Sequence, residues 1–261
     1  MDHIKDLKIV ITAGGSGIGS EMAIALSNAG AKVIICDKNK DLLESFSNEN
    51  RNIDTYHVDV SNETQIKSFF ESIADKYQNI NALVNNAGIS GPSAKLEDVS
   101  FDDWKETLSV NLDGVFLSAK YVIPLMKKNG GSIVNIGSTS SFLGTPLRSA
   151  YSATKWGLIG LTKTWAMEYG KNKIRVNAIC PSSVNGNRIE DVIKKEAKYR
   201  NCTPEKIKSA YLKQTSLNTF IDVEEVIGML VYLLSPLAKK ITGQMLVIDG
   251  HTESLAMIDI D

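Results

Sequence analysis

The chain is 261 residues long, and its 29 lysine and arginine residues almost balance its 30 aspartate and glutamate residues, which gives a formal net charge of −1. This balance excludes the strongly basic surface that proteins binding nucleic acids or anionic membranes carry. The length is enough for one large domain with a substantial apolar core.

Cysteine, targeting and membrane signals are weak. Three scattered cysteines and three isolated histidines show no metal-ligand spacing, so we expect reduced thiols and no metal site. The first residues lead directly into a strand and do not read as a signal peptide. The most apolar helical stretch, Val110 to Met126, contains Asn111, Asp113 and Lys120 and is too interrupted to span a bilayer. We therefore expect a soluble cytoplasmic protein that binds neither nucleic acid nor a membrane.

Short β-rich runs alternate with longer amphipathic stretches along the chain. Strands are predicted at Lys8–Thr12, Lys32–Cys36, Asp54–Val58, Ala82–Asn85, Ser132–Ile136, Ile174–Ile179 and Met245–Ile248. Helices are predicted at Gly17–Asn28, Lys40–Asn48, Ser61–Tyr77 with a cap at Ser61, Phe101–Lys127, Tyr151–Tyr169 and Val223–Leu234. This alternation favours an α/β fold, in which residues 1–261 form one domain with a doubly wound parallel sheet and helices on both faces.

A glycine-rich turn, Thr12 to Gly19, follows the first strand and opens the first helix, and Gly30 lies where that helix should end. Glycines in such a turn let the backbone approach a pyrophosphate, whose charge meets the positive end of the helix. Asp37 closes the second strand, where a carboxylate can accept hydrogen bonds from a ribose 2′-hydroxyl and would repel a 2′-phosphate. This position favours NAD over NADP, although an aspartate there can also cap a turn.

A second stretch, Ser132 to Lys155, begins as a strand and ends in Tyr-Ser-Ala-Thr-Lys. If a helix starts near Ser149, Tyr151 and Lys155 lie one turn apart on the same face. A lysine ammonium beside a phenol favours the phenolate, so Tyr151 could exchange a proton nearer neutral pH than free tyrosine does. Ser138, at the end of the strand, could hydrogen-bond the same substrate oxygen. The same tyrosine–lysine spacing also occurs on solvated helix faces, so the pair alone does not decide the matter.

Taken together, these motifs resemble those of the short-chain dehydrogenase/reductase family, and the resemblance covers nearly the whole chain. The stretch Thr12–Gly19 resembles the family's TGxxxGIG, Asn85–Gly88 matches NNAG, and the catalytic positions are matched by Asn111, Ser138, Tyr151 and Lys155. The family's fold is the Rossmann fold, and its reaction is hydride transfer between a nicotinamide and a secondary alcohol or ketone.

The resemblance also implies a role for each matched residue. Tyr151 would be the general acid or base, Ser138 would hold the substrate oxygen, and Lys155 would bind the nicotinamide ribose. Asn111 would position a water that links Lys155 to solvent. The cofactor would contact Gly14, Ser16, Gly17, Ile18, Gly19, Asp37, Asp59, Val60, Asn86, Ala87, Gly88, Tyr151, Lys155, Pro181 and Val184. Asn111 could instead satisfy a helix backbone, Ser138 could cap a turn, and Ile18 could be a core residue.

Three positions depart from the family pattern. Ala13 replaces the first glycine of the turn, where an alanine needs a negative φ or accepts strain. Ser182 replaces the glycine of the family's Pro-Gly pair after Pro181, and Gly137 stands where the family often has a serine. We expect all three to be tolerated because none removes a catalytic group.

Substrate contacts are expected in Gly91–Leu96, Ser140–Arg148 and Val184–Ser216, which follow the carboxyl ends of strands. Residues 185–216 are polar and helix-prone, and we expect them to form a mobile lid. Ser140, Arg148 and Arg188 are candidate substrate ligands. If both arginines point into the cleft, the substrate carries an anionic group; the alternative is that they form surface ion pairs.

The sequence therefore predicts an NAD-dependent oxidoreductase that acts on a small polar or anionic secondary alcohol or ketone. Apolar helix faces beyond the needs of one sheet, together with the family resemblance, predict a homotetramer. One alternative is a 3-oxoacyl-[acyl-carrier-protein] reductase, an activity that usually uses NADP, which Asp37 disfavours. Another is a nucleotide-binding regulator without catalysis, which the intact catalytic set disfavours.

Overall fold

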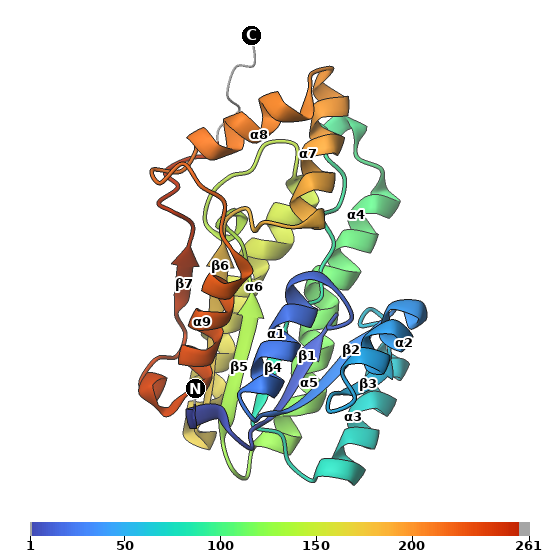
Figure 1. Ribbon diagram of the computed structural model, residues 1–261, viewed down its shortest axis with the longest axis vertical. Helices are drawn as coiled ribbons and strands as arrows, with labels where there is room; N and C mark the ends of the chain where they lie inside the picture. Colours follow the sequence, from blue (N-terminus) through green and yellow to red (C-terminus); the bar gives the residue numbers. More distant parts are fainter. Residues whose placement is uncertain (1, 256–261) are drawn as a thin grey trace.

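The computed structural model describes residues 2–255, and its centre is one sheet of seven parallel strands (Figure 1). In chain order these are β1 (Lys8–Thr12), β2 (Lys32–Asp37), β3 (Asp54–His57), β4 (Ala82–Asn85), β5 (Gly131–Ile136), β6 (Ile174–Pro181) and β7 (Met245–Ile248). Their order across the sheet is β3-β2-β1-β4-β5-β6-β7, so the direction of winding reverses between β1 and β4. The predicted doubly wound parallel sheet is confirmed, while the domain boundaries predicted at 1 and 261 lie outside the described residues.

Helices cover both faces of the sheet. On one face, α1 (Gly17–Asn28), α2 (Lys40–Glu49) and α9 (Val223–Leu234) share an apolar cluster with the strands. On the other face, α3 (Glu63–Tyr77), α5 (Gly114–Met126) and α6 (Ser149–Tyr169) do the same. The strands are buried from both sides, which is why β1 has no exposed surface at Ile9, Val10 or Ile11. Short 3-10 helices occur at Asp2–Ile4, Leu96–Asp98, Thr139–Ser141, Gly170–Asn172 and Pro236–Ala238.

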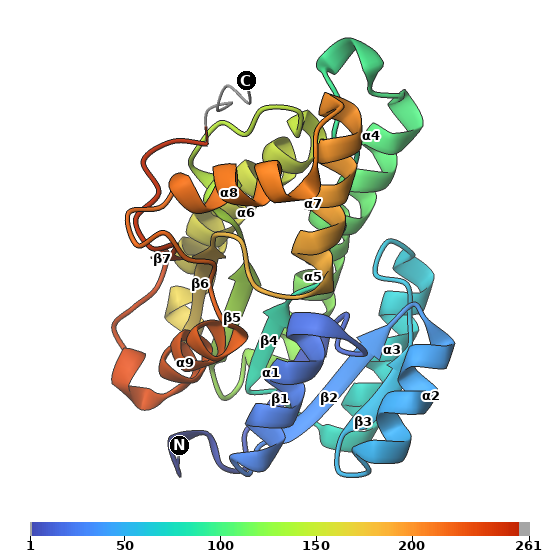
Figure 2. The ribbon, with the colours of Figure 1, turned by 45° about the horizontal axis from the view of Figure 1, so that its top comes forward.

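The segment predicted as a lid forms two helices, α7 (Asn187–Arg200) and α8 (Pro204–Lys213), which lie beyond the carboxyl ends of the strands (Figure 2). They have an apolar cluster of their own, made of Ile193, Ala197, Ile207 and Phe220. The segment therefore packs as a small unit above the edge of the sheet where the predicted site residues gather.

The predicted helix Phe101–Lys127 is not one regular helix. It consists of α4 (Phe101–Leu108), one π-helical turn (Ser109–Asp113) and α5, which ends at Met126. A π turn adds a residue to the helical repeat, and such turns are frequent at functional sites. The π turn contains Asn111, whose side chain is fully buried.

One other local expectation is corrected, and the structure decides between two alternatives at Ala13. The N-cap of α3 is Asn62, whose side chain accepts a hydrogen bond from the Gln65 amide, and not Ser61. Ser61 lies one residue before this N-cap, and its hydroxyl donates to the Asp59 carboxylate at 2.7 Å. Ala13 has a φ of 52°, so the chain accepts strain at this position. Among residues 2–255, we find no helix with the length and apolar character needed to cross a membrane.

Candidate active site

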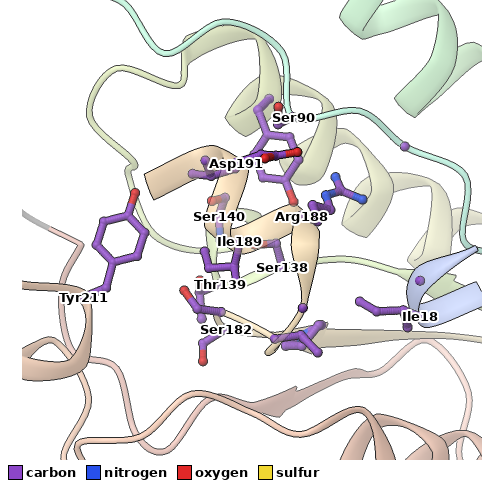
Figure 3. A pocket seen from close by; sticks show the side chains of 18 of the residues that line it. Ile18, Ser90, Ser138, Thr139, Ser140, Ser182, Arg188, Ile189, Asp191 and Tyr211 are labelled. Carbon is purple, nitrogen blue, oxygen red and sulfur yellow. Dashed lines mark hydrogen bonds between the residues drawn. The ribbon is translucent and has the colours of Figure 1, made fainter. Parts of the chain in front are cut away.

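A cavity of about 1040 Å³ opens at the carboxyl edge of the sheet, between the strand ends and the lid (Figure 3). Its walls come from the turn after β1, the loops after β4, β5 and β6, the start of α6, and α7 and α8. Ligands of open α/β sheets bind at this edge, near the point where the strand order reverses. Within residues 2–255, no group of three or more histidine, cysteine, aspartate or glutamate side chains is arranged to hold a metal ion.

The glycine-rich turn forms one end of the cavity, with Ser16, Gly17, Ile18 and Gly19 in its wall. A Cβ atom added to Gly19 would lie 2.1 Å from the Ala13 carbonyl oxygen, so only glycine fits there. The Ser16 side chain does not cap α1, and the first turn of that helix carries no acidic residue. The positive end of α1 is therefore open to an anion in the cavity.

Gly14 and Ala87 do not reach the cavity wall. A Cβ atom at Gly14 would lie 2.6 Å from the Cβ of Ile35, so this glycine lets the turn pack closely on β2. Ala87 is buried, and its amide donates to the Thr12 hydroxyl, 3.0 Å away. The same hydroxyl accepts from the Asn86 amide. The Thr12 hydroxyl thus holds the two loops together on either side of the reversal point.

Asn86 and Gly88 do line the cavity. The side-chain amide of Asn86 also donates to the carbonyl oxygens of Thr12 and Ala13, at 3.1 and 3.0 Å. These contacts fix the Asn-Asn-Ala-Gly loop against the glycine-rich turn, which agrees with a supporting role for this loop.

The acidic residues predicted to bind the cofactor, Asp37 and Asp59, are not part of the cavity wall. Asp37 is 9% exposed, and its carboxylate accepts hydrogen bonds from the amides of Gly15 and Asn39 at 3.2 and 3.0 Å. Asp59 accepts from the amide and hydroxyl of Ser61, and its neighbour Val60 is buried. Asp37 therefore shapes the turn, but a carboxylate has about four acceptor positions, so it retains capacity for a ribose hydroxyl.

Asn111 uses its side chain to fix the loop after β4. Its amide oxygen accepts from the Ile89 amide at 2.7 Å, and its nitrogen donates to the Ile89 carbonyl at 2.9 Å and to the Thr154 hydroxyl at 3.3 Å. Asn111 does not line the cavity. The side chain is thus bound to the Ile89 backbone and to Thr154 of α6. A Cβ atom added to Gly88 would lie 3.3 Å from the Asn111 amide oxygen and 3.9 Å from the Lys155 ammonium, so Gly88 faces both side chains.

Ser138 stands at the end of β5 with its hydroxyl held in place. It accepts from the Ser140 amide at 3.2 Å, and its own amide donates to the Ser141 hydroxyl at 3.1 Å. Ser138 therefore also caps the short 3-10 helix Thr139–Ser141, the alternative role predicted for it from the sequence. This cap uses the Ser138 hydroxyl only as an acceptor, so its proton can be donated to Tyr151 or to a ligand oxygen in the cavity. Gly137 is required beside it, because a Cβ atom there would meet the Cys180 sulfur at 2.6 Å.

Tyr151 and Lys155 lie one turn apart on α6 and both line the cavity. The Lys155 ammonium is 5.5 Å from the centre of the Tyr151 ring and donates to the Ile136 carbonyl oxygen at 2.7 Å. Burial lowers the pKa of Lys155, and the positive charge of Arg188 lowers it further.

The acidity of Tyr151 reflects opposing influences. Burial raises the pKa of its phenol, but the positive charges of Lys155, Arg188 and Arg148 and a hydrogen bond from Ser138 outweigh burial, so that the pKa is lowered from 10.0 to about 8. A phenol with this pKa can give or take a proton close to neutral pH.

Three candidate substrate ligands, Ser140, Arg148 and Arg188, line the cavity, together with Pro181 and Val184. Arg148 is 8% exposed and its guanidinium carbon is 4.9 Å from the centre of the Tyr151 ring. Arg188 is the second residue of α7 and is exposed (Figure 3). The two arginines thus reach the cavity from different elements, one beneath the lid and one on it.

Some lining residues were not singled out from the sequence, and one expected range does not contribute. Gly91–Leu96 is absent from the wall of the main cavity, where Ile89 and Ser90 stand instead. Gly91 and Pro92 line a smaller adjoining cavity. Tyr211 of α8 faces the main cavity from the side of the lid (Figure 3). Ser182 lines it as well, with a buried hydroxyl that has no hydrogen-bond partner among residues 2–255. No sequence motif identifies Tyr211 or Ser90 as a cavity residue, because their place in the wall depends on the packing of segments that are distant in the chain.

Comparisons with known proteins agree over nearly the full length. A family model described as enoyl-(acyl carrier protein) reductase matches residues 12–251. The 3-oxoacyl-[acyl-carrier-protein] reductase FabG of Thermotoga maritima is 37% identical over 92% of this chain and 95% of its own. The D-beta-hydroxybutyrate dehydrogenase of Rhizobium meliloti is 34% identical over 92% of this chain and 96% of its own. A crystal structure of NAD+-bound xylitol dehydrogenase matches with a TM-score of 0.91 at 28% identity, covering 95% of this chain and 99% of that one.

Proposed function

The chain belongs to the short-chain dehydrogenase/reductase family, and from that premise we propose that it transfers a hydride between NAD(H) and a small polar or anionic secondary alcohol or ketone. The observation that carries the proposal is Tyr151, a phenol with a pKa of about 8 in a cavity that also contains Ser138 and Lys155. The whole chain acts as one domain, with residues 185–216 as the lid over the substrate.

The cavity fits a dinucleotide at the end formed by the glycine-rich turn. Gly19 has no room for a side chain, and the uncapped N-terminus of α1 offers amide donors to a pyrophosphate. A bound cofactor would supply a nicotinamide ring as the hydride acceptor in oxidation and as the hydride donor in reduction. Pro181, Ser182 and Val184 would line its place in the wall.

The protein's own part is to hold the substrate oxygen and move its proton. In oxidation, the Tyr151 phenolate takes the hydroxyl proton while the carbon–hydrogen bond breaks, and a ketone results. In reduction, the neutral Tyr151 phenol returns that proton to the oxygen. Ser138 donates a hydrogen bond to the same oxygen, and the Lys155 ammonium stabilises the phenolate. Oxidation therefore speeds up as pH rises through about 8, and reduction slows.

Asp37 supports NAD over NADP. Its carboxylate lies at the end of β2 beside Gly15, where it can accept from a ribose 2′-hydroxyl and would repel a 2′-phosphate. The experiment is a fluorescence titration of the protein with NADH and NADPH. We expect tighter binding of NADH, and weaker NADH binding when Asp37 becomes alanine. Equal or tighter binding of NADPH would overturn the assignment.

A second candidate is a 3-oxoacyl-[acyl-carrier-protein] reductase, which the similarity to the Thermotoga protein supports. Preference for NADPH in the same titration would move this candidate to first place. A nucleotide-binding regulator without catalysis is the remaining alternative. It would be supported if the Tyr151→Phe variant bound the cofactor and its turnover did not differ from that of the wild-type protein.

We further propose a homotetramer in the cytoplasm. Large apolar side chains remain exposed on the helices and on the edge strand, among them Phe116 of α5, Trp156 and Met167 of α6, and Val247 of β7. Such a distribution supports burial between copies of the chain.

A further inference from the structure

We propose that Arg148 is the anchor for the carboxylate of the substrate, so that the substrate is a short hydroxy acid or the corresponding keto acid. This inference rests on the proposed function, because it names the substrate class of the same site. It also distinguishes the two candidate arginines, because it gives the carboxylate-binding role to the buried Arg148 and not to the exposed Arg188.

The Arg148 guanidinium is buried without a counter-charge. The residue is 8% exposed, and no carboxylate among residues 2–255 lies within 4.0 Å of it. One terminal nitrogen donates to the Ser90 carbonyl oxygen at 2.9 Å, while the Nε atom is buried and has no partner in the described part of the chain. A buried cation that lacks an anion and leaves donors unused is costly. A carboxylate bound in the cavity would supply both the charge and the acceptors.

The nearby acidic side chain of the lid is not available for this purpose. Glu196 also lines the cavity, but Arg200 donates to it at 2.7 Å, and the Tyr211 hydroxyl donates to its other oxygen. Burial and the Glu196 charge raise the pKa of Tyr211, so that this hydroxyl stays neutral and keeps donating. The lid carboxylate is therefore already neutralised within the lid.

The placement of Arg148 at the start of α6 also favours a bound anion. It is the N-cap residue of a 21-residue helix, its side chain forms no cap, and the first turn contains no acidic residue. A cation at this end is disfavoured by the helix dipole, and an anion is favoured. A carboxylate held by Arg148 would satisfy the arginine and the helix terminus together. The preceding residue, Leu147, has a φ of 65°, a strained conformation that fixes the direction in which the chain enters the helix.

The surroundings limit the length of the ligand. The Arg148 guanidinium lies against the ring of Tyr151, the residue whose oxygen exchanges the substrate proton. The Ser140 hydroxyl accepts from Thr145 at 2.7 Å, which leaves its own proton free to be donated into the cavity. Because the Arg148 guanidinium carbon lies 4.9 Å from the centre of the Tyr151 ring, a carboxylate bound to Arg148 would be separated from the carbon that reacts beside Tyr151 by only a few bonds. A short hydroxy acid satisfies this geometry.

The contrast with other arginines of the chain supports the assignment. Arg175 donates to the carbonyl oxygens of Leu233 and Ile241 and is not part of the cavity wall, so its charge has a structural use. Arg188 is exposed, and water can satisfy its donors. Among these arginines, Arg148 alone combines burial, an unused donor and a place in the cavity.

The test measures binding of a matched pair of probes, 3-hydroxybutyrate and its neutral amide, to the NADH-loaded protein by titration calorimetry. No turnover takes place in this complex, because an alcohol cannot be oxidised by the reduced cofactor. We expect the carboxylate to bind about tenfold or more tightly than the amide. In Arg148→Gln this preference should fall to about twofold or less, whereas Arg188→Gln should retain it. Arg148→Lys, which keeps the charge but loses the planar fork, should be intermediate.

Binding of NADH to each variant, followed by fluorescence, verifies that the fold is intact. Equal binding of acid and amide by the wild-type protein, no binding of either, or an unchanged preference in Arg148→Gln would overturn the inference. Failure of the proposed function has a different signature. The protein would then not bind NADH or NADPH, and the preference for the acid over the amide would still be measurable without cofactor.

Discussion

The acidity of Tyr151 can be tested by replacing Lys155 with methionine. Lys155 is the largest of the influences that oppose burial and lower the pKa of this phenol from 10.0 to about 8. That difference corresponds to about 2.7 kcal/mol, and it raises the ionised fraction at pH 7 from about one molecule in a thousand to about one in ten. Without the ammonium, we expect the pKa of Tyr151 to rise by about one pH unit or more.

The assay has two parts. The first is ultraviolet difference absorbance of the phenolate in the cofactor-free protein, with Tyr151→Phe as the reference that identifies the signal. The second is the pH dependence of kcat/KM for oxidation of a secondary alcohol. The wild-type value should level off above about pH 8. In the Lys155→Met variant the value should keep rising beyond that pH and be about 10- to 100-fold lower at pH 7.

The matched control is Lys163→Met, which removes an exposed lysine from the same helix. It should leave both curves unchanged. A Lys155→Met protein whose phenolate still forms with a midpoint near pH 8 would refute the electrostatic reasoning. An unchanged titration in Tyr151→Phe would show that the titrating group is not Tyr151.

Two further substitutions test the framework of the site. Gly19→Ala places a Cβ atom 2.1 Å from the Ala13 carbonyl oxygen, so NADH binding should weaken by about tenfold or more, whereas Gly160→Ala, with nothing within 4 Å, should leave it unchanged. Normal NADH affinity in Gly19→Ala would contradict the close approach. Asn111→Ala removes the partners of the half-buried Ile89 amide and carbonyl, which should lower the free energy of unfolding in urea by about 1–3 kcal/mol in total. An unchanged unfolding midpoint would mean that this contact does not hold the loop.

The sheet was largely predictable from the sequence. All seven strands were predicted within two residues at either end, because a parallel strand buried on both faces is a short apolar run such as Ile9 to Ile11. Which strands become neighbours depends on how the crossover helices pack, and the alternation of strands and helices does not contain that information.

The details of the site were less predictable, because they depend on contacts between distant segments. Nothing in the local sequence separates Arg148 from Arg188, because the burial of Arg148 depends on distant segments such as the Ser90 loop. The π turn around Asn111 has the same sequence character as the helices that flank it. Within this turn, the Asn111 side chain hydrogen-bonds the backbone of Ile89, which is 22 residues away in the chain.

The two ends of the lid segment are neighbours in space. The Ile221 amide donates to the Ser183 carbonyl at 2.9 Å, and the Asn185 amide donates to the Ile221 carbonyl at 2.8 Å, so the chain leaves and re-enters the sheet edge at one point. The entropic cost of closing a flexible loop between fixed ends grows only slowly with its length. Insertions or deletions between these two points would therefore change the entropic cost of loop closure very little and leave Ser138, Tyr151 and Lys155 in place. The lid can therefore vary in length and sequence, and the substrate range with it, while the residues that exchange the proton remain fixed at the end of β5 and on α6.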